Sequence, residues 1–193
     1  MDSIITTFIP ELIVGKDYNH YMSNIFQTLP VVGLEKEKIL DHSISHADDE
    51  GYWLEFGIHE GESLIHTAGC KLGTPNFMIH GFDSFEGLPE DWLLEETGHP
   101  NLKGKFNLEG NIPKHLLQYP NINVIKGWFD KSLPKFIKDN KINKISYLNI
   151  DSDLYSSSNT ILTLLTPYFK GDCIIYFDEF CNYPGGENGE YKA

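Results

Sequence analysis

The amino-acid sequence predicts a doubly wound α/β domain, a mostly parallel sheet with helices on both faces. From about residue 51 onward, short apolar runs typical of buried strands alternate with segments of helical periodicity. Parallel strands need crossover connections, and the intervening helices would supply these connections and cover the sheet. The predicted architecture is therefore a Rossmann-like one.

The composition bounds the class of protein. A chain of 193 residues with 40% hydrophobic content can form one domain with a real core. Its formal net charge of −13 argues against nucleic-acid binding, because phosphate contacts need clustered Lys and Arg. No apolar run approaches membrane-spanning length and no basic leader is visible. The three cysteines lack metal-type spacing, so we expect a reduced, cytoplasmic protein without membrane partners.

The first fifty residues are expected to form an arm and a covering helix ahead of the α/β domain at 51–193. A short helix is predicted around 18–28, and an apolar stripe in 34–46 predicts a second helix against the sheet edge. His42 and His46 lie four residues apart on that helix and could chelate a metal. A solvated helix face is favoured, because no third ligand is visible nearby in the sequence.

The strands and helices of the α/β domain are expected in strict alternation. The long segment 84–110 exceeds an ordinary connection and is interpreted as a functional lid or a mobile loop. The expected strands are 52–58, 77–83, 122–128, 145–151 and 172–178, and the expected helices are 62–72, 112–119, 133–140 and 157–169.

Chemically useful residues gather at the carboxyl ends of these strands, where ligands bind in open α/β sheets. One acid alone would more often be a turn or cap residue, but five such strand ends at one edge predict a site. In chain order the residues are Glu55 and Gly57, Asp83, Gly127 and Trp128, Asp151 and Asp153, and Asp178 and Glu179.

The stretch 52–63 predicts a strand, a tight turn and a helix start around a ligand. Gly57 and Gly61 would let something bound approach the main chain. Asp83 suits a ribose, because a carboxylate accepts hydrogen bonds from both vicinal hydroxyls. Glu55 and the wide glycine spacing suit a pyrophosphate poorly, so S-adenosylmethionine is preferred over a nicotinamide dinucleotide. A nicotinamide-dependent oxidoreductase stays as an alternative.

Five blocks of the sequence resemble the successive motifs of a known family, the macrocin-type O-methyltransferases. These are class I enzymes that use S-adenosylmethionine and a divalent metal to methylate sugar hydroxyls. The blocks at 81–89 (Gly-Phe-Asp-Ser-Phe-Glu-Gly-Leu-Pro) and 151–157 (Asp-x-Asp-x-Tyr-x-Ser) are specific, whereas the glycine turn is not. The resemblance runs from about Tyr52 to the end, and its other blocks are 55–63, 126–134 and 174–179.

The resemblance implies a role for each candidate residue. Glu55, Gly57, Gly61 and Ser63 would lie near the methionine part of the cofactor, Asp83 would hold the ribose, and Ser84, Phe85, Gly127 and Trp128 would surround the adenine. Asp151, Asp178 and Glu179 would bind magnesium.

The metal prediction also has a physical argument. The fourth and fifth strands should be neighbours about 4.8 Å apart, so acids at their ends can reach one ion. Oxygen ligands suit magnesium, which can take a substrate hydroxyl in an open position and lower its pKa. Asp151 could then accept the proton. His59 and His99 are rival bases, and Trp92 could stack on a sugar.

The end of the chain carries further expectations. Class I methyltransferases usually close their sheet with two more strands, and only fourteen residues follow Glu179, so these strands are expected to be missing. Strand five would then be an exposed edge, which favours a homodimer. The acceptor is expected to be a sugar or similar hydroxylated small molecule. The other alternative is a binding module for S-adenosylmethionine that has lost catalysis.

Overall fold

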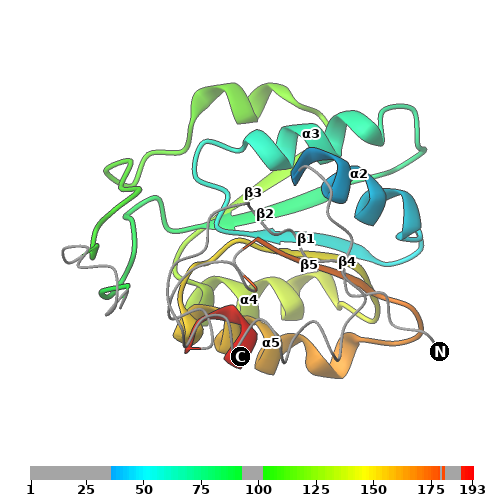
Figure 1. Cartoon of the computed structure of the whole chain (residues 1–193). Coiled ribbons are helices and arrows are strands. Elements are labelled where there is room, and N and C mark those ends of the chain that lie inside the picture. The colour runs from blue at the N-terminus through cyan, green and yellow to red at the C-terminus, as the bar shows by residue number, and fades with distance from the viewer. Residues whose placement is uncertain (1–35, 93–101, 179, 181–187) are drawn as a thin grey trace.

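The computed structural model describes residues 36–92, 102–178, 180 and 188–193 (Figure 1). Its five strands form one sheet in the order β3-β2-β1-β4-β5, and every pair of neighbours is parallel. This order reverses direction between β1 and β4, as the predicted doubly wound fold requires. The strands are β1 Tyr52–Phe56, β2 Ile79–Asp83, β3 Ile122–Lys126, β4 Ile145–Ile150 and β5 Ile174–Phe177.

Two layers of helices cover the sheet, which confirms the predicted architecture. Helices α2 (Lys36–His46) and α3 (Glu62–Cys70) lie on one face, and α4 (Phe129–Asn140) and α5 (Tyr155–Leu165) lie on the other (Figure 1). Side chains of β1 alternate between the two cores. Trp53 packs with the α2–α3 layer, whereas Leu54 and Phe56 pack with the α4–α5 layer.

Several helix boundaries differ from the predicted ones. Helix α4 begins at Phe129 and not at 133, because the carbonyl oxygen of Trp128 accepts hydrogen bonds from the backbone N–H groups of Lys131 and Ser132. Pro134 therefore lies inside this helix. The segment after 112 forms only a short 3₁₀ helix, Lys114–Gln118, and α5 continues into a 3₁₀ turn, Thr166–Tyr168. The helix predicted around 18–28 and the start of the covering helix lie outside the described residues.

None of the helices in the described ranges has the length and apolar character that crossing a membrane requires. A last 3₁₀ turn, Glu190–Lys192, packs against α5. Its Glu190 side chain is buried, and Oε1 accepts a hydrogen bond from the backbone N–H of Ser152 at 3.0 Å. This contact brings the described carboxyl-terminal turn to the chain segment that follows β4.

Candidate active site

A cleft of about 930 Å³ opens at the carboxyl edge of the sheet. Each strand contributes a lining residue at or just beyond its last residue, as the pattern of strand ends predicts. These residues are Gly57 after β1, Asp83 at the end of β2, Trp128 after β3, Asp151 after β4 and Asp178 after β5.

Backbone hydrogen bonds hold these strand ends together beyond the last paired residues. The N–H of Gly57 donates to the carbonyl of Phe82 at 2.9 Å, and the N–H of Asp151 donates to Phe56 at 2.9 Å. The N–H of Asp178 donates to Ile150 at 2.9 Å in the same way. The floor of the cleft is therefore a continuation of the sheet and not a set of independent loops.

Asp83 is fixed by two main-chain donors. The N–H of His59 donates to Oδ2 at 2.8 Å, and the N–H of Phe85 donates to Oδ1 at 2.7 Å. Burial raises the pKa of this carboxyl, and these hydrogen bonds oppose the rise. A carboxylate has about four acceptor positions, so each oxygen keeps one for a ligand hydroxyl. The geometry fits the predicted ribose contact.

Gly57 and Gly61 are required by the packing of the chain itself. Gly57 has φ +85°, and a Cβ there would lie 1.6 Å from the carbonyl oxygen of Asp151. Gly61 has φ +83°, and a Cβ there would lie 2.4 Å from a methyl group of Leu116. The sequence suggests that a ligand lies against these two glycines. In the structure, the atoms that leave no room for a Cβ at these positions belong to the protein itself.

Glu55 lies behind the cleft, fully buried on β1. The hydroxyl of Ser63 donates to its Oε1 at 2.6 Å, while Oε2 has no hydrogen-bond partner among the described residues. Burial raises the pKa of Glu55 to about 7, although the side chains of Ser63 and Asn149 oppose the rise. A buried acceptor without a donor is unfavourable, so this position suits a ligand that brings an N–H group.

Four acids crowd the ends of β4 and β5. Burial raises the pKa of Asp151 well above its ordinary range, and the charges of Asp178, Asp153 and Glu190 raise it further. Burial also raises the pKa of Asp153 to about 6, partly offset by Lys105. Like charges in a buried site favour protons or a cation.

The acid at the end of β5 already has a cationic partner. The Nζ of Lys36 lies 2.6 Å from Oδ1 of Asp178 and 2.7 Å from Oδ2, and the hydroxyl of Tyr176 donates to Oδ1 at 3.2 Å. Glu179, the third predicted ligand, lies outside the described residues. Within the described ranges, no further acid joins Asp151 and Asp178 in a cluster whose ligand atoms all lie within 4.8 Å of one another.

About half of the predicted site residues line the cleft. Phe85 packs in the core at 1% exposure. Gly127 begins the turn to Trp128, and its N–H donates to the backbone carbonyl oxygen of Asp83 at 2.8 Å. The predicted residues that line the cleft are Gly57, Asp83, Ser84, Trp128, Asp151 and Asp178, and those that do not are Glu55, Gly61, Ser63, Phe85 and Gly127. His59 also lines it, whereas His99 lies outside the described residues.

The segment after β2 supplies cleft residues that the sequence analysis missed. Backbone hydrogen bonds of 3.0 Å join Leu88 to Lys105 and Gly104 to Leu88, so the described parts of 84–110 fold back on themselves. This folding brings Lys105 and Phe106 to the cleft, which Trp92 also lines. The only sequence signal for them was the length of the segment, because their contacts depend on its fold.

Comparison with known proteins identifies a family. A model of the macrocin-O-methyltransferase (TylF) family matches residues 33–188. The crystal structure of CalS11, a calicheamicin methyltransferase, has a TM-score of 0.67 and 22% identity, over 90% of this chain and 69% of that chain. An apo structure of CalS11, a TDP-rhamnose 3'-O-methyltransferase, has a TM-score of 0.51 and 20% identity, over 87% and 68%. At these identities the two structures show a shared fold.

One curated relative carries a different name. Hydroxyacylglutathione hydrolase of Cronobacter sakazakii (strain ATCC BAA-894) is 31% identical over 114 residues. The match covers 55% of this chain and 45% of the relative, so the chain spans less than half the length of that protein. The matched part is too small to carry the activity of the whole relative to this chain.

Proposed function

This chain belongs to the macrocin-O-methyltransferase (TylF) family, and from that premise we propose that it transfers a methyl group from S-adenosylmethionine to a hydroxyl of a sugar or related small molecule. The observation that carries the proposal is Asp83. Its two fixed oxygens face the cleft at the end of β2, the position from which a carboxylate can hold both ribose hydroxyls.

The residues around Asp83 also favour S-adenosylmethionine as the cofactor. Glu55 lies behind the cleft, and its Oε2, unpartnered among the described residues, would accept a hydrogen bond from the ammonium of the methionine moiety. Ser84, which follows Asp83 at the end of β2, and Trp128, which follows the neighbouring strand β3, line the cleft and could wall an adenine. Membership of a methyltransferase family also disfavours the alternative, hydride transfer from a nicotinamide dinucleotide.

A divalent cation held by Asp151, Asp178 and Glu179 is the second part of the proposal. It would supply charge that lowers the pKa of the acceptor hydroxyl. The support is electrostatic, because burial and then the neighbouring acids raise the pKa of Asp151, and a cation would relieve the repulsion among these acids. Asp151 is then placed to take the hydroxyl proton. Lys36 would have to leave Asp178 before an ion could bind there.

The acceptor class is inferred from the outer part of the cleft. Trp92 and Phe106 offer aromatic surface for a sugar ring, and Lys105 and Lys131 add positive charge in a protein of strongly negative net charge. The volume of about 930 Å³ suits a small-molecule site. CalS11 is a TDP-rhamnose 3'-O-methyltransferase, and the lysines would suit the same class of acceptor, a nucleotide-linked sugar, here.

A direct assay tests the proposal. The purified chain should bind S-adenosylhomocysteine in calorimetry and methylate members of a panel of sugars and nucleotide sugars, with activity lost on chelation and restored by Mg²⁺. Asp151→Asn should abolish turnover while sparing cofactor binding, and Asp139→Asn, a matched change on the exposed side of α4, should alter neither. Failure to bind the cofactor would overturn the proposal. Binding without turnover would favour a catalytically impaired binding module.

We also propose that copies of the chain associate through β5. This strand lies at the end of the sheet order and pairs only with β4 among the described strands. An unpaired edge is a template for another strand. Light scattering at high protein concentration should show a dimer, and a stable monomer would contradict this part.

A further inference from the structure

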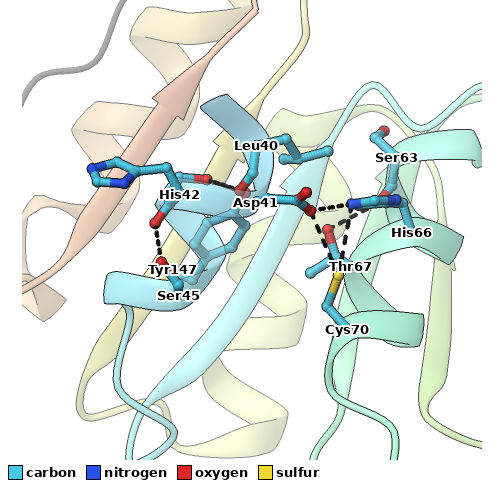
Figure 2. Close-up of polar contacts among 10 residues, drawn as sticks. Leu40, Asp41, His42, Ser45, Ser63, His66, Thr67, Cys70 and Tyr147 are labelled. Atoms are coloured by element: carbon cyan, nitrogen blue, oxygen red, sulfur yellow. Dashed lines mark hydrogen bonds and ion pairs between the residues drawn. The ribbon is translucent and has the colours of Figure 1, made fainter. Parts of the chain in front are cut away.

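A second cluster of polar side chains lies between α2 and α3 (Figure 2). Asp41 projects from α2, and His66 and Cys70 project from α3. Their ligand atoms all lie within 4.8 Å of one another, and all three residues are exposed or partly exposed. None of the three lines the cleft, so the proposed methyl transfer does not use them.

The fold fixes the direction of each side chain. His66 and Cys70 are four residues apart on α3 and therefore share one face of the helix. Leu40 and Ile44 bury the inner face of α2, which leaves the carboxylate of Asp41 directed toward α3 (Figure 2). The cluster is thus a product of the packing between two helices and not of one flexible loop.

The contacts in the cluster join three atoms, one from each residue. Nε2 of His66 lies 2.6 Å from Oδ1 of Asp41 and 3.6 Å from Sγ of Cys70, and Sγ lies 3.8 Å from Oδ1. A nucleophilic Cys–His–Asp arrangement uses the two ring nitrogens separately, one for the thiol and one for the carboxylate. Here both groups approach Nε2, which does not match that chemistry.

The electrostatics also disfavour a reactive thiol and favour a cation. Burial and the carboxylate of Asp41 raise the pKa of Cys70, and the charge of Lys71 opposes the rise. Cys70 is the last residue of α3, where the helix dipole is negative, and the last turn carries no basic residue. A bound cation would satisfy all of these groups together.

We propose that Asp41, His66 and Cys70 bind one transition-metal cation, with Zn²⁺ the best match. Zinc bond lengths of about 2.3 Å to sulfur and about 2.1 Å to nitrogen or oxygen place tetrahedral ligands about 3.4–3.6 Å apart. The two contacts of Sγ, at 3.6 and 3.8 Å, already have nearly this spacing. Only the contact of 2.6 Å between Asp41 and His66 must widen, by about 0.8 Å, which the exposed carboxylate allows.

The ligand chemistry separates this site from the cleft. A thiolate and an imidazole select zinc-like ions over magnesium, whereas the acids at the ends of β4 and β5 offer only oxygen. With three protein ligands, the fourth position would be left to water or another ligand.

Cobalt provides a direct test, because Co²⁺ bound by a thiolate gives a near-ultraviolet charge-transfer band. One equivalent of Co²⁺ added to the reduced full chain should produce this band, and Zn²⁺ should displace it. Cys70→Ser should abolish the band, and Asp41→Asn and His66→Ala should each weaken Zn²⁺ binding at least tenfold. Cys173→Ser, a change of a part-buried cysteine far from the cluster in sequence, should leave the band unchanged.

A second readout keeps the test independent of metal binding in the cleft. Zn²⁺ should slow alkylation of Cys70 by iodoacetamide, located by mass spectrometry, both in the wild type and in Asp151→Asn. Circular dichroism should show that Cys70→Ser is folded, as expected for an exposed position. Absence of the band in the wild type, its persistence in Cys70→Ser, or unprotected alkylation would overturn the proposal.

Discussion

Replacing Glu55 with Gln tests whether this buried carboxyl, with one oxygen unpartnered among the described residues, lowers the free energy of unfolding. The side chain is fully buried, and burial raises its pKa from 4.5 to about 7 against the opposing hydrogen bond from Ser63. Gln has nearly the same shape and keeps an acceptor for the Ser63 hydroxyl, but it cannot ionise. The substitution therefore removes the charge and little else.

The magnitude follows from linkage between proton binding and folding. Between about pH 4.5 and pH 7 the native protein keeps a proton on Glu55 that the unfolded chain has released. The free energy of unfolding of the wild type therefore falls as the pH rises through this range. The rise in pKa from 4.5 to about 7 corresponds to about 3 kcal/mol, at about 1.4 kcal/mol for each pH unit.

Urea denaturation between pH 4 and pH 8 measures this effect. Relative to the wild type, Glu55→Gln should become more stable by up to about 3 kcal/mol across this range. The difference should grow between about pH 4.5 and pH 7 and stay nearly constant above pH 7. Glu60→Gln, on an exposed residue of the turn after β1, is the matched control and should follow the wild type at every pH. Parallel pH profiles for Glu55→Gln and the wild type would refute the reasoning.

The same variant addresses the proposed role of Glu55 toward the cofactor. If the ammonium of S-adenosylmethionine pairs with Glu55, binding at pH 7 should release a proton from the wild type, detected by calorimetry in buffers of different ionisation enthalpy. Glu55→Gln should release none and should bind more weakly. Equal affinity of the two proteins for S-adenosylmethionine would contradict the proposed ammonium contact. It would not affect the predicted pH dependence of unfolding.

Three further changes have defined outcomes. Gly57→Ala should lower the free energy of unfolding, measured by thermal denaturation, by more than about 2 kcal/mol, because the backbone is left-handed and a Cβ would lie 1.6 Å from a carbonyl oxygen. Gly69→Ala, in open space on α3, should raise it by about 0.5–1 kcal/mol. Lys36→Met should raise Mg²⁺ affinity several-fold in calorimetry, because Asp178 loses its cationic partner, and an unchanged affinity would place the ion elsewhere. Asp83→Asn should weaken S-adenosylhomocysteine binding at least tenfold, and intact binding would exclude the ribose contact.

The sheet and the position of the cleft could be predicted because they depend on local signals. Apolar runs identify all five strands, and the topology rule for parallel sheets then brings Asp83, Asp151 and Asp178 to one edge. The predicted first and third strands each extend two residues beyond the observed β1 and β3. Those residues leave the paired region because Gly57 and Gly127 have positive φ. Sequence periodicity does not report that change in backbone conformation.

The remaining features depend on contacts between distant segments. Phe85 belongs to a motif at a strand end, yet its ring packs into the core, and only the three-dimensional turn decides that direction. Likewise, the spacing of His42 and His46 in the sequence suggests a metal-binding pair on one helix, and their ring centroids lie 4.1 Å apart. The neighbouring Asp41 meets residues of α3 instead, which requires knowing how the two helices pack.

The continuation of the sheet ladder past the strand ends has a mechanical consequence. The turn after β1 presses against the backbone of Asp151, closely enough that no side chain fits between them at Gly57. A displacement of either segment would therefore be transmitted to the other. In the proposed reaction the methyl donor would rest on one segment and the proton acceptor would stand on the other. Their separation would be set by backbone contact, which favours an in-line transfer that tolerates little misplacement.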